Sequence, residues 1–404
     1  MSIQSIKKIH TLHGRRVLIR VDFNVPLTDN LIQDDIRLRA SLPTIKYLIQ
    51  EGAKVILVTH LGRPEGKVVS LLSVDPIAIR LSELLRRHVQ KVDSGGWGDT
   101  EYKNVQKAVE GMKSGDVVLL DNIRFSPEEE KNTVAFAKRL ADLADLFVLD
   151  GFSVAHRAAA SVSGVAALLP SYAGLLLEKE LDGLSRVTKR PKKPFTLVLG
   201  GAKMETKIPV MDVLLPKATH VLIGGGIANT YLAAAGYGVG DSLVDDGQKD
   251  TALMFCKKKN VVLPVDVIVG TMDGTKYRHV TLEKQPHVVC QTGEAILDIG
   301  PETIRLFATY IKKAKTLLWN GAMGYFEQKP YHHGTCSVAR LVATQSRGSA
   351  FGVIGGGETL QAMDIVGMSH DVDLVSTGGG AMLEYIGGKP LPGLEALAGK
   401  KKRR

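Results

Sequence analysis

Short runs rich in Val, Leu and Ile alternate with longer amphipathic stretches along almost the whole 404-residue chain, and this alternation constrains the fold most. In the first half the apolar runs lie at 16–21, 54–59, 116–120 and 145–149, and the amphipathic stretches between them include 35–50, 73–88 and 127–142. Uninterrupted apolar strands separated by helices are typical of a parallel sheet covered on both faces. We therefore predict an α/β fold with doubly wound, mostly parallel sheets.

The second half repeats this pattern, with apolar runs at 195–199, 220–223, 261–263, 316–319, 351–354 and 372–375. A chain of this length can form two domains that each bury a core. An amphipathic helix is predicted before the repeat, and Pro191 and Pro194 end it because proline cannot continue a helix. We expect an N-terminal domain over 1–172, an interdomain helix over 173–190 and a C-terminal domain over 191–388.

In the first half, cationic and polar residues follow the predicted strands. They are Arg20, Asp22 and Asn24 after the first strand, His60 and Arg63 after the second, Arg124 after the third, and His156 and Arg157 after the fourth, with Arg37 at the start of a predicted helix. A single arginine is usually a surface charge. Several that follow neighbouring parallel strands converge on one edge of the sheet, where guanidinium groups match carboxylate and phosphate oxygens. This edge is predicted to bind a small, multiply charged anion.

In the second half, glycine clusters take that place, at 200–201, 224–226, 355–357 and 378–380. The last cluster joins an apolar run to a predicted helix, an order that aims backbone N–H groups and a helix N-terminus at an anion. A tight turn explains one such cluster equally well. Four clusters at strand ends favour a polyphosphate or nucleotide site.

Charged residues accompany these glycines. Lys203 and Lys207 are four residues apart, and in a helix they would share one face near its N-terminus, where the dipole disfavours cations unless an anion binds. Two solvated lysines are the alternative. Glu358 follows the 355–357 cluster and suits the Mg²⁺ of a nucleotide, although it is also an ordinary helix-start acid. Glu327 is a candidate acceptor for ribose hydroxyls.

Several common motifs are absent from the sequence, among them the Walker A loop, the dinucleotide-binding GxGxxG after a strand, and the protein-kinase set. Five positive charges of the net +10 lie in the basic tail, residues 400–404, so we do not expect a nucleic-acid partner. Three scattered cysteines fit a reducing compartment. Without an apolar span or a signal peptide, we expect a cytoplasmic monomer that contacts no membrane.

The motifs taken together resemble the phosphoglycerate kinase family, and the match runs over nearly the whole chain. The segments that carry it are RVDFNVP (20–26), THLGRP (59–64), LLDNIRF (119–125), AHRAAAS (155–161), LGGAKMETKI (199–208), IGGGIANT (223–230), WNGAMGYFE (319–327), GGGET (355–359) and STGGGAMLE (376–384). The resemblance implies two Rossmann-like domains that face each other across a cleft and are joined by a helix, with 389–404 packing back on the N-terminal domain.

The resemblance also implies a reaction: reversible phosphoryl transfer between 1,3-bisphosphoglycerate and Mg-ADP, giving 3-phosphoglycerate and ATP after hinge closure. In the ATP-consuming direction the nucleophile is a carboxylate, already ionised at pH 7, so no general base is needed. The enzyme then positions the groups in line and stabilises charge on the transferring phosphoryl group. Mg²⁺ is the implied cofactor, and ATP or ADP is a substrate.

Motif position assigns roles to individual residues. Those implied to bind 3-phosphoglycerate are Asp22, Phe23, Asn24, Arg37, His60, Leu61, Gly62, Arg63, Arg124 and Arg157. Those implied to bind nucleotide are Gly201, Lys203, Lys207, Gly224, Gly225, Asn320, Glu327, Gly356, Gly357, Glu358, Thr359, Thr377, Gly378 and Gly379, with Glu358 as the metal ligand. The implied catalytic groups are Arg37, Lys203, Lys207, Gly357 and Gly380.

The chain departs from the usual family pattern at a few positions. Asp121 stands where the family usually has Glu, and Glu358 stands where it commonly has Asp. Ala159 replaces a frequent His, Thr206 replaces a frequent Asp, and Ala322 replaces a usual Pro. Three other readings remain open: a catalytically silent relative, a nucleic-acid binder that uses the basic tail, and an α/β kinase acting on a different carboxylate.

Overall fold

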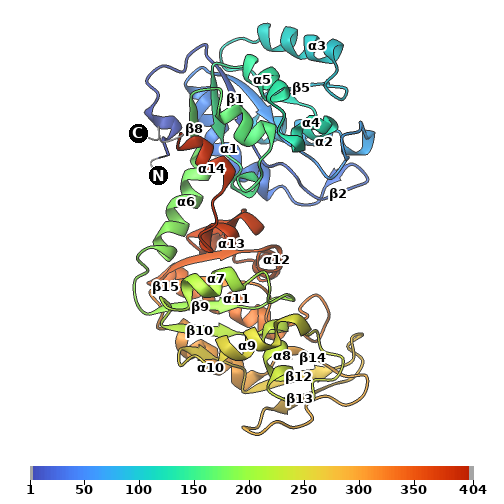
Figure 1. The fold of residues 1–404 in the computed structure, drawn as a ribbon, viewed down its shortest axis with the longest axis vertical. Coiled ribbons are helices and arrows are strands. Elements are labelled where there is room, and N and C mark those ends of the chain that lie inside the picture. The colour runs from blue at the N-terminus through green and yellow to red at the C-terminus, as the bar shows by residue number, and fades with distance from the viewer. Residues whose placement is uncertain (1–2, 400–404) are drawn as a thin grey trace. The chain divides into compact units, whose positions relative to one another are not determined.

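The computed structural model describes residues 3–399, so the basic tail, residues 400–404, lies outside the described residues. The chain divides into two compact units: unit 1 contains Met1–Glu180 and Pro390–Arg404, and unit 2 contains Leu181–Lys389. The boundary falls inside helix α6, Leu175–Thr188. Each unit contains a six-stranded sheet flanked by helices (Figure 1).

Unit 1 is built on a parallel sheet with the strand order β5-β6-β4-β1-β7-β8. The strands are β1 (Arg16–Arg20), β4 (Lys54–Val58), β5 (Val89–Val92), β6 (Val117–Leu120), β7 (Leu146–Leu149) and β8 (Ser171–Ala173). Central β1 pairs in parallel with β4 on one side and β7 on the other. This confirms the predicted doubly wound sheet. The short strands β5 and β8 were not predicted, because neither is a run of apolar residues.

Both faces of this sheet are covered. Val17 and Ile19 of β1 pack with helices α1 (Ile36–Gln50) and α2 (Asp75–Leu85), and the alternate residue Leu18 is also fully buried. The remaining helices of unit 1 are α3 (Asp99–Glu110), α4 (Pro127–Lys131), α5 (Val134–Asp142) and α14 (Pro392–Leu397), with short turns η1 (Ile6–Lys8), η2 (Ser70–Leu72), η3 (Ile123–Phe125), η4 (Phe152–Val154) and η5 (Ala160–Gly164), beside the hairpin β2 (Leu27–Thr28) and β3 (Leu31–Ile32). Within unit 1, α14 packs against η5 and β8, and Gly393 N–H donates to the Ala155 carbonyl at 2.9 Å (Figure 1).

The prediction of one helix over 127–142 was wrong. Helix α4 ends at Lys131, and Asn132 adopts a left-handed conformation with φ 51°. Thr133 then begins α5, since its hydroxyl accepts a hydrogen bond from Phe136 N–H at 3.4 Å. Asparagine tolerates the left-handed region and threonine caps helices, so both residues favour a break that amphipathic periodicity alone does not reveal.

Unit 2 repeats the scheme with the strand order β11-β10-β9-β15-β16-β17, again parallel. The strands are β9 (Phe195–Leu199), β10 (His220–Ile223), β11 (Val261–Val262), β15 (Thr316–Asn320), β16 (Phe351–Gly355) and β17 (Leu374–Ser376). The helices are α7 (Ile208–Leu214), α8 (Gly225–Ala234), α9 (Lys249–Cys256), α10 (Pro301–Ile311), α11 (His333–Gly348), α12 (Gly357–Ile365) and α13 (Gly380–Ile386), with turns η6 (Asp246–Gln248) and η7 (Ser369–Asp371). All six predicted strands of the second half are present.

A second sheet in unit 2 was not predicted. It is antiparallel, with the order β13-β12-β14, and contains β12 (Asp266–Gly270), β13 (Tyr277–Thr281) and β14 (Ala295–Ile299). Edge strand β13 is mostly exposed and therefore carries no apolar run that would reveal it. Within residues 3–399, none of the helices is both long enough and apolar enough to cross a bilayer.

Candidate functional site

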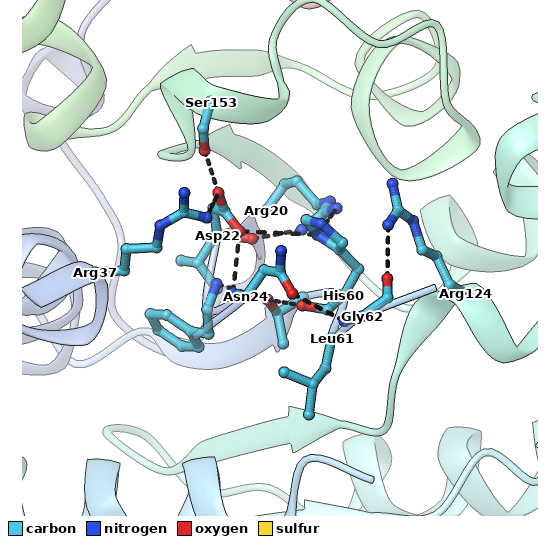
Figure 2. Close-up of polar contacts among 12 residues, drawn as sticks. Arg20, Asp22, Asn24, Arg37, His60, Leu61, Gly62, Arg124 and Ser153 are labelled. Carbon is cyan, nitrogen blue, oxygen red and sulfur yellow. Dashed lines mark hydrogen bonds and ion pairs between the residues drawn. The ribbon is translucent and has the colours of Figure 1, made fainter. Parts of the chain in front are cut away.

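The polar residues predicted in unit 1 do gather at one edge of its sheet. Strands β6, β4, β1 and β7 are consecutive neighbours and run parallel, so their carboxyl ends lie side by side. Arg124 follows β6, His60 follows β4, and Asp22 follows β1 (Figure 2). The strand order reverses at β1, and open α/β sheets bind ligands at such a point.

Asp22 lies at the centre of this edge and is 7% exposed. Its carboxylate forms an ion pair with Arg37 and accepts a hydrogen bond from the Ser153 hydroxyl (Figure 2). Burial alone would raise the pKa of Asp22, but the electrostatic interactions with His60 and Arg37, the Ser153 hydrogen bond and the charge of Arg20 hold it below its ordinary value. Asp22 therefore remains ionised and fixes the Arg37 guanidinium at the site.

Three loops of the edge are tied together through Gly62. Its N–H donates to the side-chain oxygen of Asn24 at 2.8 Å, and its carbonyl accepts from Arg124 Nη1 at 2.8 Å (Figure 2). Arg124 Nε also lies 3.2 Å from a carboxylate oxygen of Glu130. The loops after β1, β4 and β6 are thus held in one arrangement by their own polar groups.

Two arginines of the predicted set are not paired with a carboxylate of the described residues. Arg63 and Arg157 are exposed, and within residues 3–399 neither forms an ion pair. In contrast, Phe23 and Leu61 are buried in the hydrophobic core, so only their backbone groups can face a ligand. The edge therefore combines fixed cations with free ones, as an anion site requires.

Glycine turns at the carboxyl ends of the unit 2 strands pack against each other. The sheet reverses between β9 and β15, and a Cβ on Gly200 would lie 2.0 Å from the Ala322 carbonyl oxygen. At this position close packing of two turns explains the glycine without a ligand. At Gly357, Gly379 and Gly380, nothing lies within 4 Å of an added Cβ, so space for an approaching group remains there.

The predicted helix carrying Lys203 and Lys207 is absent, and that expectation was wrong. Residues 205–207 form a turn, and α7 begins only at Ile208, with Pro209 in its first turn. Proline favours the first turn of a helix, and this signal places the start of α7 near residue 208. Lys203 is exposed, whereas Lys207 is 9% exposed and donates to the side-chain oxygen of Asn320.

Asn320, Thr359 and Glu358 join the ends of β15 and β16. Asn320 Nδ2 donates to the Gly355 carbonyl at 2.5 Å, and Gly321 N–H donates to the Thr359 hydroxyl at 2.7 Å. Glu358 Oε2 accepts from Ala322 N–H at 3.2 Å. Burial lowers the pKa of Lys207, and the negative charge of Glu358 opposes this. The two side chains therefore lie near enough to interact electrostatically.

A cavity of about 420 Å³ opens beside these turns, entirely within unit 2. Its walls include the predicted residues Gly201, Gly225, Glu327 and Glu358, together with Ala322 and Met323. Lys203, Lys207 and Asn320 do not line the cavity as the described residues form it. Thr377, Gly378 and Gly379 follow β17, next to Gly356 after β16, because Gly355 and Ser376 are partners across these strands.

Glu358 is the carboxylate predicted to bind a metal in this region. Among the residues that the structure describes, no group of three or more His, Cys, Asp or Glu side chains is arranged to hold a metal ion. Glu358 is exposed, and one of its carboxylate oxygens accepts a hydrogen bond from Ala322 N–H. A single carboxylate suits Mg²⁺, which keeps several waters and takes its other ligands from substrate phosphates. The donor set therefore fits a nucleotide-borne Mg²⁺ and does not form a closed metal cage.

The departures from the family pattern have structural partners here. Asp121 Oδ1 accepts from Val74 N–H at 3.2 Å, which ties the start of α2 to the end of β6. Ala159 is buried and, unlike a histidine, provides no cation at that position. The exposed Thr206 bonds the Lys203 carbonyl at 3.0 Å. Ala322 has the N–H that Glu358 uses, and a proline would lack it.

Some polar residues of the unit 1 edge were missed in the sequence. Ser153 follows β7 as Asp22 follows β1, so the same strand-end rule identifies it. Glu129 and Ser161 are buried and bonded to each other, but they lie in a helix and a helical turn away from any strand end. No local pattern distinguishes Glu129 from its neighbours Glu128 and Glu130.

Comparison with known proteins places the chain in one family. The sequence profile described as "Phosphoglycerate kinase" matches residues 6–389. The phosphoglycerate kinase of Pelotomaculum thermopropionicum is 47% identical over 394 residues, covering 96% of this chain and 97% of the relative, and that of Moorella thermoacetica is 45% identical over 396 residues, covering 96% and 98%.

Solved structures agree with the sequence comparison. A phosphoglycerate kinase structure from Coxiella burnetii matches with a TM-score of 0.85 and 37% identity, covering 98% of this chain and 99% of the other. One from Pyrococcus horikoshii matches with a TM-score of 0.82 and 33% identity, covering 98% of each. Profile, sequence and structure all lead to the same conclusion: this chain belongs to the phosphoglycerate kinase family.

Proposed function

We propose that the enzyme binds 3-phosphoglycerate at the polar edge of unit 1 and Mg-nucleotide at the glycine-rich edge of unit 2. Its reaction is reversible phosphoryl transfer between 1,3-bisphosphoglycerate and ADP, giving 3-phosphoglycerate and ATP. The observation that carries the assignment of roles is the environment of Lys207.

Lys207 is a buried cation without a matching anion. Its ammonium group donates to the neutral amide of Asn320, and it has no ion-pair partner in residues 3–399. Removing a charge from water is costly unless an opposite charge compensates it. Because burial already lowers the Lys207 pKa, a phosphate oxygen at this position would stabilise the ammonium form. Lys207 is thus the best candidate to hold the phosphoryl group in transit.

The unit 1 edge fits the other substrate. 3-Phosphoglycerate carries a carboxylate and a phosphate, and the edge offers Arg37 held by Asp22, Arg124 held by Gly62, and the unpaired Arg63 and Arg157. Guanidinium groups bind such oxygens through two parallel N–H bonds. Asn24 would support the same loops through Gly62.

The reaction requires the protein to position the substrates and to stabilise charge on the transferring phosphoryl group. The substrate carboxylate is the nucleophile and is ionised at pH 7, so no residue has to remove a proton. Arg37 in unit 1, Lys203 and Lys207 in unit 2, and the backbone amides of residues 377–380 are proposed to stabilise charge on the phosphoryl group. Because these groups belong to different units, we infer that the units close during turnover and exclude water.

Glu358 is proposed as the protein ligand of the Mg²⁺ that accompanies the nucleotide. When bound, the ion neutralises phosphate charge. Glu358 itself orients one carboxylate oxygen by accepting from Ala322 N–H, which leaves the other oxygen for a ligand. We also propose that the enzyme acts in a reducing cytoplasm, since Cys256, Cys290 and Cys336 are all buried free thiols. The proposed oligomeric state is a monomer.

A coupled assay tests the proposal. Purified full-length enzyme is supplied with Mg-ATP and either 3-phosphoglycerate or a panel of other phosphorylated carboxylic acids, and the reverse reaction is run with Mg-ADP. The proposal predicts turnover in both directions with 3-phosphoglycerate as the preferred acid. Faster turnover with another carboxylate would reassign the unit 1 site, and no product in either direction at high enzyme concentration would indicate a silent relative.

A further inference from the structure

Arg20, the last residue of β1, is a buried cation that acts as the donor in all of its hydrogen bonds. It is 2% exposed, and its Nη1 donates to the Val21 carbonyl. Its Nε lies 2.8 Å from the Ser161 hydroxyl. Its Nη2 lies 3.2 Å from Nδ1 of His60 (Figure 2). Arg20 thus connects a serine of η5 with the histidine of the anion edge.

These contacts indicate where the protons lie on His60. A guanidinium has only N–H donors, so Nδ1 of His60 must accept and carries no proton. A histidine ring with a bare Nδ1 is neutral and carries its one proton on Nε2. Asp22 Oδ1 is 3.8 Å from the same Nδ1, too far to impose the other tautomer.

The charges around His60 favour this neutral form. Burial lowers its pKa most, and the positive charges of Arg20, Arg124 and Arg157 lower it further, leaving it well below the ordinary value. The Asp22 carboxylate opposes this and raises the His60 pKa, but Asp22 is already paired with Arg37. Geometry and electrostatics therefore agree on an uncharged imidazole.

The other end of the chain of bonds terminates in a carboxylate. Because Arg20 can only donate, the Ser161 hydroxyl accepts from it and directs its own proton to Glu129 Oε1, 2.6 Å away. Ser161 N–H donates to Glu129 Oε2 at 2.9 Å. Burial raises the pKa of Glu129, yet both its oxygens accept hydrogen bonds, and the charge of Arg20 favours the ionised form.

We propose that Glu129, acting through Ser161 and Arg20, is a positioning residue that holds His60 as the neutral tautomer protonated on Nε2. The substrate side of this inference rests on the proposed binding of 3-phosphoglycerate at the unit 1 edge. Among residues 3–399, Nε2 has no hydrogen-bond partner, and it is not one of the buried polar atoms that lack one, so it keeps contact with solvent. His60 then offers a substrate oxygen a donor without adding a positive charge beside three arginines.

Nitrogen NMR of the full-length enzyme, with its histidine rings labelled with ¹⁵N, tests the tautomer without substrate. A nitrogen that bears a proton and one that bears a lone pair have well-separated shifts, and His60→Asn identifies the His60 signals by their loss. At pH 7 the proposal predicts a lone-pair Nδ1 and a protonated Nε2. An imidazolium, or a proton on Nδ1, would overturn it.

Glu129→Gln tests the positioning role, with Glu128→Gln on the same helix as its matched control. The amide keeps the shape but can accept at only one atom, so Ser161 and Arg20 are anchored less firmly, and a second His60 population with a protonated Nδ1 is expected where Arg20 no longer donates to it. The Kd for 3-phosphoglycerate is expected to rise about fivefold, the equivalent of one hydrogen bond, while ATP binding stays unchanged. Glu128→Gln should match the wild type in both measurements.

An unchanged His60 spectrum and an unchanged Kd in Glu129→Gln would overturn the positioning role. If that variant fails to fold, Ser161→Ala breaks the same chain while keeping the carboxylate, and the same two changes are expected of it. If wild-type enzyme does not bind 3-phosphoglycerate, the proposed function fails, whereas the spectrum recorded without substrate still decides the tautomer.

Discussion

Glu358 accepts a hydrogen bond from the backbone N–H of Ala322 at 3.2 Å, and both residues depart from the usual pattern of the family. The family commonly has the shorter aspartate at the first position and proline, which has no N–H, at the second. The longer acid of this chain reaches a donor that the usual residue cannot provide. The two departures therefore form one local arrangement at the proposed metal position.

This contact predicts that the two positions are energetically coupled. Ala322→Pro leaves the Glu358 oxygen without its partner, and Glu358→Asp withdraws the acid, so each change alone is expected to raise the Mg²⁺ concentration needed for half-maximal activity about three- to tenfold. The double variant restores the usual pair and is expected to lie closer to the wild type than the two single effects combined predict. Steady-state rates over a Mg²⁺ titration measure this, and simple additivity would contradict it.

Asn24 is expected to matter for the acid substrate through Gly62. Asn24→Ala removes the acceptor of the Gly62 N–H and releases the loop after β4, so KM for 3-phosphoglycerate should rise about tenfold with a smaller change in kcat. The exposed Asn104 on α3 offers the control Asn104→Ala, which should leave both constants unchanged. A tenfold fall in kcat with an unchanged KM for 3-phosphoglycerate would show that Asn24 does not act through substrate binding.

Gly379 tests the turn that precedes α13. Its backbone, with φ 51° and ψ −119°, suits glycine alone, and the space beside it is open. Gly379→Val is expected to lower kcat at least tenfold and to leave the Kd for 3-phosphoglycerate intact, since that site lies in unit 1. Gly388 at the other end of α13 also has positive φ and open space, so Gly388→Val reproduces the strain away from the site. Equal losses in both variants would make the turn merely structural.

The sequence predicts the unit 1 edge well for a simple reason. Asp22, His60 and Arg124 each follow an apolar run, and parallel strands necessarily bring their carboxyl ends together. Ser153 obeys the same rule and was overlooked. In contrast, the roles of Glu129 and Ser161 depend on tertiary packing of η5 against α4 and are invisible to any local pattern.

In unit 2, the sequence predicts which residues lie near the glycine turns better than it predicts their backbone conformation. Lys203 and Lys207 share a spacing that suits a helix, yet the chain turns there, and Pro209 marks the true helix start. The glycine clusters have mixed causes, because Gly200 is needed by packing against Ala322 while Gly379 faces open space. Sequence cannot separate these causes, since both require the same residue type.

Asp150 is expected to make stability depend on pH. It is fully buried, and its Oδ1 accepts from Leu176 N–H at 3.0 Å at the start of α6, while among the described residues its Oδ2 has no partner. Burial raises the pKa of Asp150 from the ordinary 3.8 to about 7. Between these values the folded chain holds a proton that the unfolded chain has lost, so its contribution to stability is present at low pH and lost as pH rises toward 7.

Asp150→Asn cannot titrate and serves as the comparison. From pH 5 to 7 the free energy of unfolding of the wild type should fall relative to that of the variant, by up to about 1.4 kcal/mol per pH unit, and the difference should stay level above pH 8. Urea titrations followed by tryptophan fluorescence at pH 5, 6, 7 and 8 give the two curves. A difference that does not change with pH would mean that Asp150 is ionised in the folded enzyme throughout.

The steady-state kinetics of Lys207→Ala test most directly the claim that Lys207 stabilises the phosphoryl group in transit. Removing a charge that acts mainly in the transition state is expected to lower kcat about 100- to 1,000-fold, with a far smaller change in KM for ATP. Lys257→Ala, an exposed lysine at the end of α9, should behave as the wild type. An unchanged kcat in correctly folded Lys207→Ala, or a rise in KM alone, would contradict the account.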